Sequence, residues 1–239
     1  MRINKYISST GYCSRRKAEE IITEGRVRVN GELANINTVI DENIDVVTID
    51  GKKIEVMEEK IYLLLNKPVG ITCTTERHIK GNIIDYVNYP KRIFPVGRLD
   101  KDSHGLILLT NDGDIVNKAL REENNHSKEY LVQVDKPILP SFIQKMKAGV
   151  EIYNPVQHEM VKTKKCKVSP AGKRSFKIVL TQGYNRQIRR MCKACGYRVI
   201  DLERIRFMNL QDEKLEMGKW RKLTSKEIED LYKECEIKG

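Results

Sequence analysis

Two short runs of consecutive apolar residues constrain the fold of this chain most. One is residues 61–65 of "IYLLLNKPVG", which ends in a Pro/Gly turn, and the other is Leu106–Leu109 after Gly105. Short apolar runs bounded by turn residues are typical of strands in a protein core. Besides the strand expected over 105–110, the same reasoning predicts strands at 129–135, 175–182 and 199–208.

Helical periodicity predicts helices between and after these strands. They are expected at 83–88, 113–121, 139–147, 185–195 and 225–234. Thr224 and Glu227 have the spacing of a capping box at the start of the last helix. Strands and helices in this mixed order, with several hairpins, predict an α+β domain built around a mixed, mostly antiparallel sheet.

The first sixty residues predict a smaller unit. Two short helices are expected at 2–9 and 14–24, with Gly11 in the turn between them. Ser14 is suited to cap the second helix and Gly25 to stop it. The stretch "RVRVNGELA" alternates apolar and basic residues before an Asn-Gly hairpin turn, and "DVVTIDGKKIEV" turns at Asp-Gly. The charged segment Val56–Lys60 is interpreted as a linker between domains spanning 1–58 and 60–239.

Charge is distributed unevenly along the chain. The formal net charge is +11, and residues 161–200 carry twelve Lys or Arg and no Asp or Glu. Residues 1–30 hold seven basic and three acidic side chains, whereas 31–58 hold two basic and seven acidic ones. A charge run is ordinarily a solvated face. Forty residues without an acid instead favour binding to a polyanion.

Several classes of protein are disfavoured by what the sequence lacks. No stretch approaches the roughly eighteen consecutive apolar residues of a membrane span, and the N-terminus has no apolar signal-peptide core. The six cysteines are scattered, which suits a reducing cytoplasm. Cys192 and Cys195 have no second ligand pair near them and are interpreted as helix packing residues. Four scattered histidines form no cluster, and His104 is interpreted as a loop residue.

Three segments carry candidate functional residues. Asp100 stands in "GRLDKDSHGL", Tyr130 in "KEYLV", and a strongly basic helix start follows Gly183 in "GYNRQIRRM". Each has an ordinary structural explanation: Asp is common in turns, a tyrosine can be a core residue, and the arginines can contact phosphates. No nucleotide-binding loop or zinc-protease motif is present, so neither a cofactor nor a metal is expected.

The N-terminal pattern "RINKYISSTGYCSRRKAEEIITEGRVRVNGELA" resembles an S4 RNA-binding domain. Members of that family grip folded RNA through its phosphates. Basic side chains at a helix start oppose the helix dipole, so phosphate binding explains this placement better than helix stability does. The residues to which the resemblance assigns RNA binding are Arg2, Lys5, Ser14, Arg15, Arg16, Lys17, Arg26 and Asn30.

The rest of the chain resembles the pseudouridine synthases. The segments "NKPVG" (66–70), "GRLDKDSHGL" (97–106), "KEYLV" (128–132) and "GYNRQIRRM" (183–191) occur in the order of that family's motifs. The S4 domain and the "NRQIRR" form point to the RsuA/RluB/RluF branch. Other short segments, such as "NDGDIVNK" and "TKKCKV", are most similar in sequence to members that act on large-subunit (23S) ribosomal RNA. His104 occupies a variable motif slot, and Ser103 stands where many relatives have Thr.

The resemblance implies an isomerisation in which the C1′–N1 bond of a uridine breaks and C1′ joins C5. It implies that Asp100 is the catalytic carboxylate, that Arg189 pairs with it to keep it ionised, and that Tyr130 lies against the target base. Whether the carboxylate attacks the sugar, attacks the base or removes a 2′ proton is left open. The other residues assigned to the substrate are Arg98, which would fill the gap left in the stack, Leu99, Lys128, Arg186, Ile188 as an apolar wall, and Arg190.

Such chemistry requires the base to leave its stack, which costs a few kcal/mol and least in a loop or bulge. The resemblance implies ribosomal RNA, with 23S rRNA favoured, as the partner; no membrane, metal or cofactor is expected, and the protein is expected to be a monomer. Two alternatives stay open. The enzyme could act on small-subunit (16S) rRNA or tRNA, or the chain could be a non-catalytic RNA-binding factor in ribosome assembly.

Overall fold

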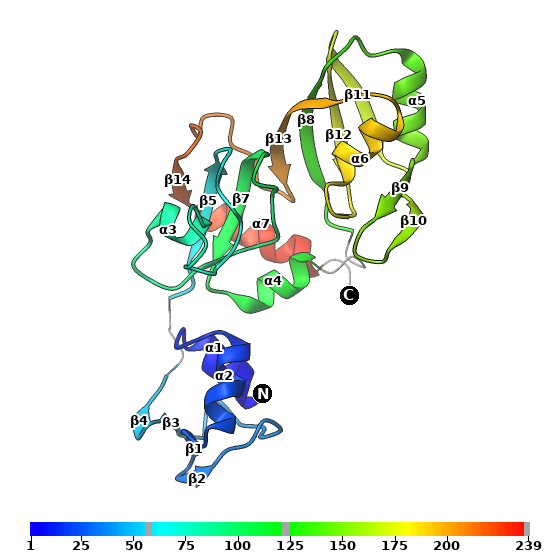
Figure 1. Ribbon diagram of the computed structural model, residues 1–239. Helices are drawn as coiled ribbons and strands as arrows, with labels where there is room; N and C mark the ends of the chain where they lie inside the picture. Colours follow the sequence, from blue (N-terminus) through cyan, green and yellow to red (C-terminus); the bar gives the residue numbers. More distant parts are fainter. Residues whose placement is uncertain (56–58, 121–124, 237–239) are drawn as a thin grey trace. The chain divides into compact units, whose positions relative to one another are not determined.

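The computed structural model describes residues 1–55, 59–120 and 125–236 (Figure 1). The chain divides into two compact units. Unit 1 is Met1–Ile61 with the short segments Tyr89–Ile93 and Asn111–Gly113, and unit 2 is the remainder. Residues 56–58 of the predicted linker lie outside the described residues. No helix among the described residues is long and apolar enough to cross a membrane.

Unit 1 has the predicted helical hairpin followed by a small sheet. Helices α1 (Ile3–Ser9) and α2 (Arg15–Thr23) pack on each other. Strands β1 (Val27–Val29), β2 (Glu32–Leu33), β3 (Val47–Ile49) and β4 (Lys52–Lys53) form a sheet in the order β2-β1-β3-β4. Positive φ angles at Asn30–Gly31 and Asp50–Gly51 produce the two predicted hairpin turns.

The second helix of unit 1 begins and ends as its sequence predicts. The Ser14 side chain accepts a hydrogen bond from the Lys17 backbone N–H, and Gly25 follows the helix with a φ of 72°. Ala18, Ile21 and Ile22 face the unit's core and are buried. The opposite side is left free for the basic residues at the helix start.

Unit 2 is built on one large sheet. Its strands run in the order β11-β12-β8-β13-β7-β5-β14, and β6 pairs with β7 in addition. The strands are β5 (Tyr62–Lys67), β6 (Phe94–Pro95), β7 (His104–Thr110), β8 (Lys128–Val134), β11 (Lys167–Gly172), β12 (Ser175–Leu180), β13 (Val199–Phe207) and β14 (Trp220–Lys222). Strands β9 (Glu151–Asn154) and β10 (Glu159–Lys162) form a separate hairpin.

Among the strands that the structure describes in this sheet, only the neighbouring pair of β7 and β13 is parallel. The two strands approach very closely at Gly105, because a Cβ there would lie 2.4 Å from the Arg204 backbone oxygen. Gly105 also has a φ of 108°, which side chains rarely tolerate. The mixed, mostly antiparallel sheet predicted from the sequence is confirmed, and Gly105 fixes its parallel crossing.

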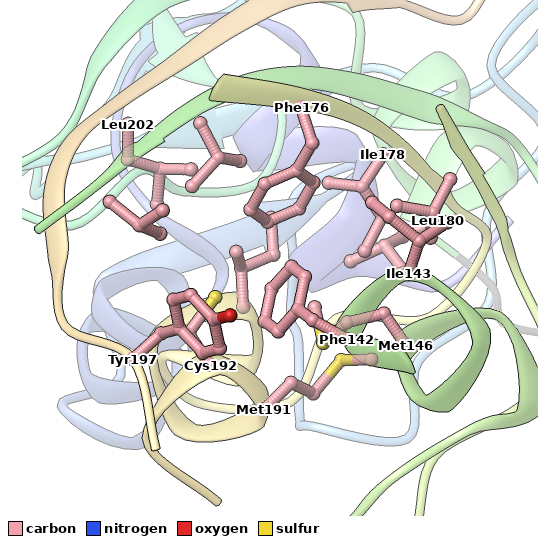
Figure 2. Packing of buried hydrophobic residues seen from close by; sticks show 14 of the residues in the cluster. Phe142, Ile143, Met146, Phe176, Ile178, Leu180, Met191, Cys192, Tyr197 and Leu202 are labelled. Atoms are coloured by element: carbon pink, nitrogen blue, oxygen red, sulfur yellow. The ribbon is translucent and has the colours of Figure 1, made fainter. Parts of the chain in front are cut away.

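Helices of unit 2 pack against the sheet, and two hydrophobic cores lie between helices and strands. The helices are α3 (Ile83–Val87), α4 (Gly113–Leu120), α5 (Pro140–Ala148), α6 (Gln187–Ala194) and α7 (Ser225–Glu236). Phe142 of α5 and Met191 of α6 pack on Phe176 and Ile178 of β12 (Figure 2). A second core joins β5 and β7 to α4 and α7. The predicted capping box is present, since Glu227 and Thr224 exchange hydrogen bonds at the start of α7.

Some strands were not predicted, and one residue was placed wrongly. Strands β10, β11 and β14 are largely exposed and lack the apolar runs that identify core strands. His104 is not a loop residue as predicted. It is the first residue of β7, buried, with Nε2 2.9 Å from an Asp201 carboxylate oxygen on β13. The parallel pairing with β13 extends the strand one residue before Gly105.

Candidate active site

Asp100 lies on the turn between β6 and β7. Gly97 begins this turn with a φ of 75°, and the Ser103 backbone N–H closes it by donating to the Asp100 carbonyl at 3.1 Å. The side chain of Asp100 is 30% exposed. It is therefore neither buried in the core nor free in bulk water, and it lines a cleft.

Neighbouring backbone holds this turn from both sides. The Gly70 N–H donates to the Lys101 carbonyl at 2.7 Å, and the Leu99 N–H donates to the Cys73 sulfur at 3.4 Å. The Lys67 ammonium, fully buried, donates to the Pro68 and Ile71 carbonyls at 2.9 Å each and so braces the segment that carries Gly70. The sequence motif "NKPVG" thus supports the turn that presents Asp100.

The cation nearest to Asp100 comes from the start of α6. Arg186 donates to both carboxylate oxygens of Asp102, at 2.9 and 2.7 Å. Its Nη1 lies 3.8 Å from an oxygen of Asp100. The hydrogen bonds from Arg186 hold the pKa of Asp102 below its usual range, because they favour the ionised form. Arg186 therefore joins α6 to the Asp100 turn.

The predicted ion pair between Arg189 and Asp100 is not present. Arg189 donates instead to the Asp102 carbonyl at 2.8 Å and to the Ser103 hydroxyl at 3.1 Å. One helical turn separates it from Arg186, so its side chain reaches the backbone of the turn rather than the Asp100 carboxylate. In this structure Arg189 holds the position of Asp100 without contacting its charge.

A cleft of about 1120 Å³ brings together most of the other predicted substrate residues. Tyr130 on β8 and Ile188 on α6 lie in its wall with Asp100, and Ile188 is buried. Arg98, Leu99, Lys128 and Arg186 also line the cleft. Arg98 is exposed, as a side chain that enters an RNA stack must be.

Arg190 is not brought to the cleft. Its guanidinium donates to the backbone and side-chain oxygens of Asn185, in the turn before α6. It is a residue of the surface beside the cleft and supports the α6 start.

Three residues of the site were not identified from the sequence. Asp102 is only two positions from Asp100, so the segment "GRLDKD" could have indicated a second carboxylate on the same turn. Lys67 lies inside a recognised motif. Arg204 on β13 lines the cleft although it is almost fully buried, and no sequence pattern marked it.

The basic residues predicted to bind RNA in unit 1 differ in whether their side chains already form ion pairs within the domain. Arg15 and Arg16 are exposed and form no ion pair among the described residues. Arg2 is exposed at the start of α1, where Lys5 also lies. Lys17 pairs with Glu20. Arg26 pairs with Asp50 and Glu24.

Asn30 and Ser14 have structural roles as well. The Asn30 side chain donates to Asp45 and accepts from the Val46 N–H, and Ser14 caps α2. Arg2, Arg15 and Arg16 are therefore side chains that can turn to a phosphate without breaking a hydrogen bond or ion pair among the described residues.

No group of three or more His, Cys, Asp or Glu side chains among the described residues is arranged to hold a metal. Cys192 is buried in the core of α6, and Cys195 packs against the same core. Burial raises the pKa of Cys192 to about 12, which keeps the thiol neutral.

The arrangement therefore offers a carboxylate, a tyrosine and an apolar wall around a cleft bordered by arginines. The carboxylate can act as a nucleophile or base on a group held beside the tyrosine. The arginines suit an anionic substrate, since guanidinium groups bind phosphates through paired hydrogen bonds.

Comparison with known proteins gives consistent matches over the whole chain. Residues 61–194 match the family described as RNA pseudouridylate synthase, and residues 1–43 match the S4 domain. The "Dual-specificity RNA pseudouridine synthase RluF" of Salmonella typhi is 53% identical over 97% of this chain and 78% of its own length. The "Ribosomal large subunit pseudouridine synthase B" of Bacillus subtilis is 35% identical over 96% of this chain and 95% of its own length. A solved structure described as a pseudouridylate synthase is similar with a TM-score of 0.71 and 28% identity, over 97% of this chain and 99% of that one.

Proposed function

This chain belongs to the RNA pseudouridylate synthase family and carries an S4 domain, and from that premise we propose that it isomerises a specific uridine of large-subunit ribosomal RNA to pseudouridine. The family predicted from the motifs is confirmed by these matches. The observation that carries the proposal is the convergence of Asp100, Tyr130 and Ile188 on one cleft. These residues come from three motifs far apart in the sequence.

In the proposed reaction the uridine leaves its stack and enters this cleft, because C1′ and C5 cannot exchange partners inside a stacked helix. Asp100 acts as the carboxylate of the reaction, and Tyr130 and Ile188 hold the base. Arg98 fills the space that the base leaves. The free arginines of the S4 domain and the basic surface of 161–200 bind phosphates and position the RNA.

The choice of large-subunit rRNA rests on relatives. The Bacillus subtilis relative is named for the large ribosomal subunit. The sequence of the short segments outside the main motifs also favours large-subunit rRNA. The Salmonella typhi relative is named dual-specificity, which favours a second RNA as an additional substrate; small-subunit rRNA and tRNA are the candidates. We propose that the protein works as a monomer without a cofactor. The six cysteines are thiols rather than disulfides in this structure, which fits the reducing cytoplasm that we propose as the location of the protein.

Pseudouridine mapping of total RNA tests the proposal. Carbodiimide-based maps are compared for cells with the gene, cells without it, and deleted cells that express Asp100→Asn. We expect one large-subunit position to lose its signal on deletion and to stay unmodified with the variant. A map unchanged by deletion would favour a non-catalytic RNA-binding factor. A lost signal only in small-subunit rRNA or in tRNA would retain the enzyme and reject the substrate.

A further inference from the structure

A row of paired residues crosses the sheet of unit 2 beside the cleft. Lys67 on β5 pairs with Gly105 on β7, Gly105 pairs with Arg204 on β13, and Arg204 pairs with Tyr130 on β8. Residues directly opposite each other in a sheet point to the same face. Because Gly105 has no side chain, the row places a lysine and an arginine on that face, with the arginine next to Tyr130.

Arg204 is the member of this row with an unmet hydrogen bond. Its side chain is 1% exposed, and its Nε donates to the Leu106 carbonyl at 2.6 Å. The guanidinium carbon lies 4.9 Å from the centre of the Phe207 ring. Its buried Nη2 has no partner among the described residues, although Arg204 lines the cleft. A buried charged donor without an acceptor is costly, so an acceptor in the cleft that reached Nη2 would be bound favourably.

A second cation lies close to Arg204, because the charge of Arg204 acts on the Lys67 ammonium. Lys67, fully buried, bonds only to backbone carbonyls. Neither Lys67 nor Arg204 has a carboxylate within ion-pair distance among the residues that the structure describes. The carboxylates of Asp100 and Asp102 act on Lys67 only from beyond ion-pair distance, so neither buried cation is directly paired. An anion in the adjoining cleft would therefore be favoured, since charges interact more strongly away from water. The ligand of Arg204 should therefore carry negative charge or develop it.

The proposed isomerisation supplies that charge. When the C1′–N1 bond breaks, its electron pair stays with the ring, and the charge is shared by N1 and the two carbonyl oxygens. If Asp100 instead adds to the base, the charge also reaches a ring oxygen. We propose that Arg204 is a further catalytic residue, whose Nη2 donates to a carbonyl oxygen of the flipped uracil and stabilises the negative charge that the ring carries during isomerisation.

The atoms balance without a proton from Arg204. On the bond-breaking routes, C1′ becomes bonded to an Asp100 oxygen, or Asp100 takes the 2′ proton and later returns it. The ring then turns and C5 bonds to C1′, either displacing the Asp100 oxygen or adding to the C1′–C2′ double bond as the 2′ proton returns to C2′. The C5 proton is then lost and N1 takes up a proton. Arg204 stays protonated throughout, as its high intrinsic pKa requires. Its contribution is electrostatic and resembles that of an oxyanion-hole donor.

The inference rests on the proposed function and is tested with the RNA segment that the mapping identifies. Arg204→Met removes the donor while keeping an apolar side chain of similar length. The control is Arg206→Met, on the same strand, because Arg206 is bonded to Glu129, Ser127 and the Met208 carbonyl and does not line the cleft. Circular dichroism checks the fold, and filter binding measures RNA affinity.

Single-turnover rates are measured on transcripts containing uridine or 5-fluorouridine, as loss of the starting nucleoside. Fluorine withdraws electrons and stabilises the ring anion by itself. The rate on 5-fluorouridine should therefore depend less on a hydrogen-bond donor to the ring. We expect Arg204→Met to lose about 100-fold in rate on uridine, as for removal of an oxyanion-hole donor. The loss on 5-fluorouridine should be several-fold smaller, with unchanged RNA affinity. Arg206→Met should lose equally on both substrates, if it loses at all.

Equal losses of Arg204→Met on the two substrates, or a loss confined to RNA affinity, would overturn the inference. If Arg204→Met does not fold, Arg204→Lys replaces it: the ammonium keeps the charge but loses the reach of Nη2, so a smaller difference between the substrates is expected, and no difference rejects the proposal. Wild-type protein that makes no pseudouridine would reject the proposed function instead. An active wild type with an unaffected Arg204→Met rejects only the role of Arg204.

Discussion

Arg189 donates a hydrogen bond to the backbone carbonyl of Asp102, 2.8 Å away, and does not pair with the carboxylate of Asp100. Together with its bond to the Ser103 hydroxyl, this contact ties helix α6 to the turn that presents the proposed catalytic group. Arg186 makes the second tie through the Asp102 carboxylate. Arg189 Nε also lies 3.7 Å from an oxygen of that carboxylate. Both arginines therefore act on the same turn, but only Arg189 is hydrogen-bonded to its backbone.

Replacing these arginines by lysine should separate the two contributions. Arg189 is 15% exposed and Arg186 40% exposed at the side chain. Since water can replace the exposed contact more readily, Arg189→Lys should slow single-turnover isomerisation by about 100-fold and Arg186→Lys by about 10-fold. Both variants should keep RNA affinity in filter binding. The reverse order of the two rates would show that the Asp102 carboxylate, rather than the turn backbone, controls Asp100.

Asp100→Asn should abolish pseudouridine formation, because an amide cannot act as a nucleophile or base. The change keeps the size of the side chain, so RNA affinity should stay within about threefold. Liquid chromatography of digested RNA after a single turnover measures the product. Asp230→Asn on α7, which only loses a surface pair with Lys226, is the matched control. Product formed at a normal rate by Asp100→Asn would remove this residue from the mechanism.

Gly105→Ala should destabilise unit 2 by about 2 to 4 kcal/mol, through a strained φ and overpacking against β13. The added Cβ would meet the Arg204 backbone oxygen at 2.4 Å, which a side-chain rotation cannot relieve. Urea denaturation measures the change. Gly113→Ala provides the comparison, since nothing lies within 4 Å of that position. Equal stabilities of the two variants would show that β7 and β13 lie farther apart at Gly105 than they do in this structure.

The exposed arginines of the S4 domain should bind RNA phosphates. Arg15→Gln and Arg16→Gln should each weaken RNA binding and lower the slope of log affinity against log salt by about one. Lys17→Gln should change this slope less, because Lys17 already pairs with Glu20. Filter binding from low to moderate salt measures all three. A slope that is insensitive to both arginine changes would place the RNA on another surface of this domain.

The ion pair of Glu227 with Arg221 should make unit 2 sensitive to acid. Hydrogen bonds from Arg221 lower the pKa of Glu227 from 4.5 to about 2. A carboxylate whose pKa is lower in the folded state stabilises it above the unfolded pKa, and that stabilisation is lost as the pH falls toward the folded pKa. After allowance for solvent screening it should amount to about 1 to 2 kcal/mol.

Denaturation of wild type and Glu227→Gln measures this effect. The wild type should be more stable by that amount at pH 7, and the difference should shrink between pH 4.5 and pH 2. The surface pair of Lys233 with Glu229, removed by Glu229→Gln, is the control and should change stability much less. A difference that is the same at pH 7 and pH 3 would contradict the assigned pKa shift.

The amino-acid sequence was enough to predict the two-part organisation and the main helices and core strands, and to nominate Asp100, Tyr130 and Ile188 for the site that we propose. Local patterns are sufficient for these, because apolar periodicity, capping residues and turn glycines act over a few positions. The partners across the sheet could be read only from the folded chain. The parallel contact of β7 with β13 joins residues about a hundred positions apart and lies at the buried His104. The pairing of β13 with β8 places Arg204 beside Tyr130, and α6 brings Arg189 to the backbone of the Asp100 turn. Such contacts depend on which strands pair and in which register, and neither is encoded in a short stretch of chain.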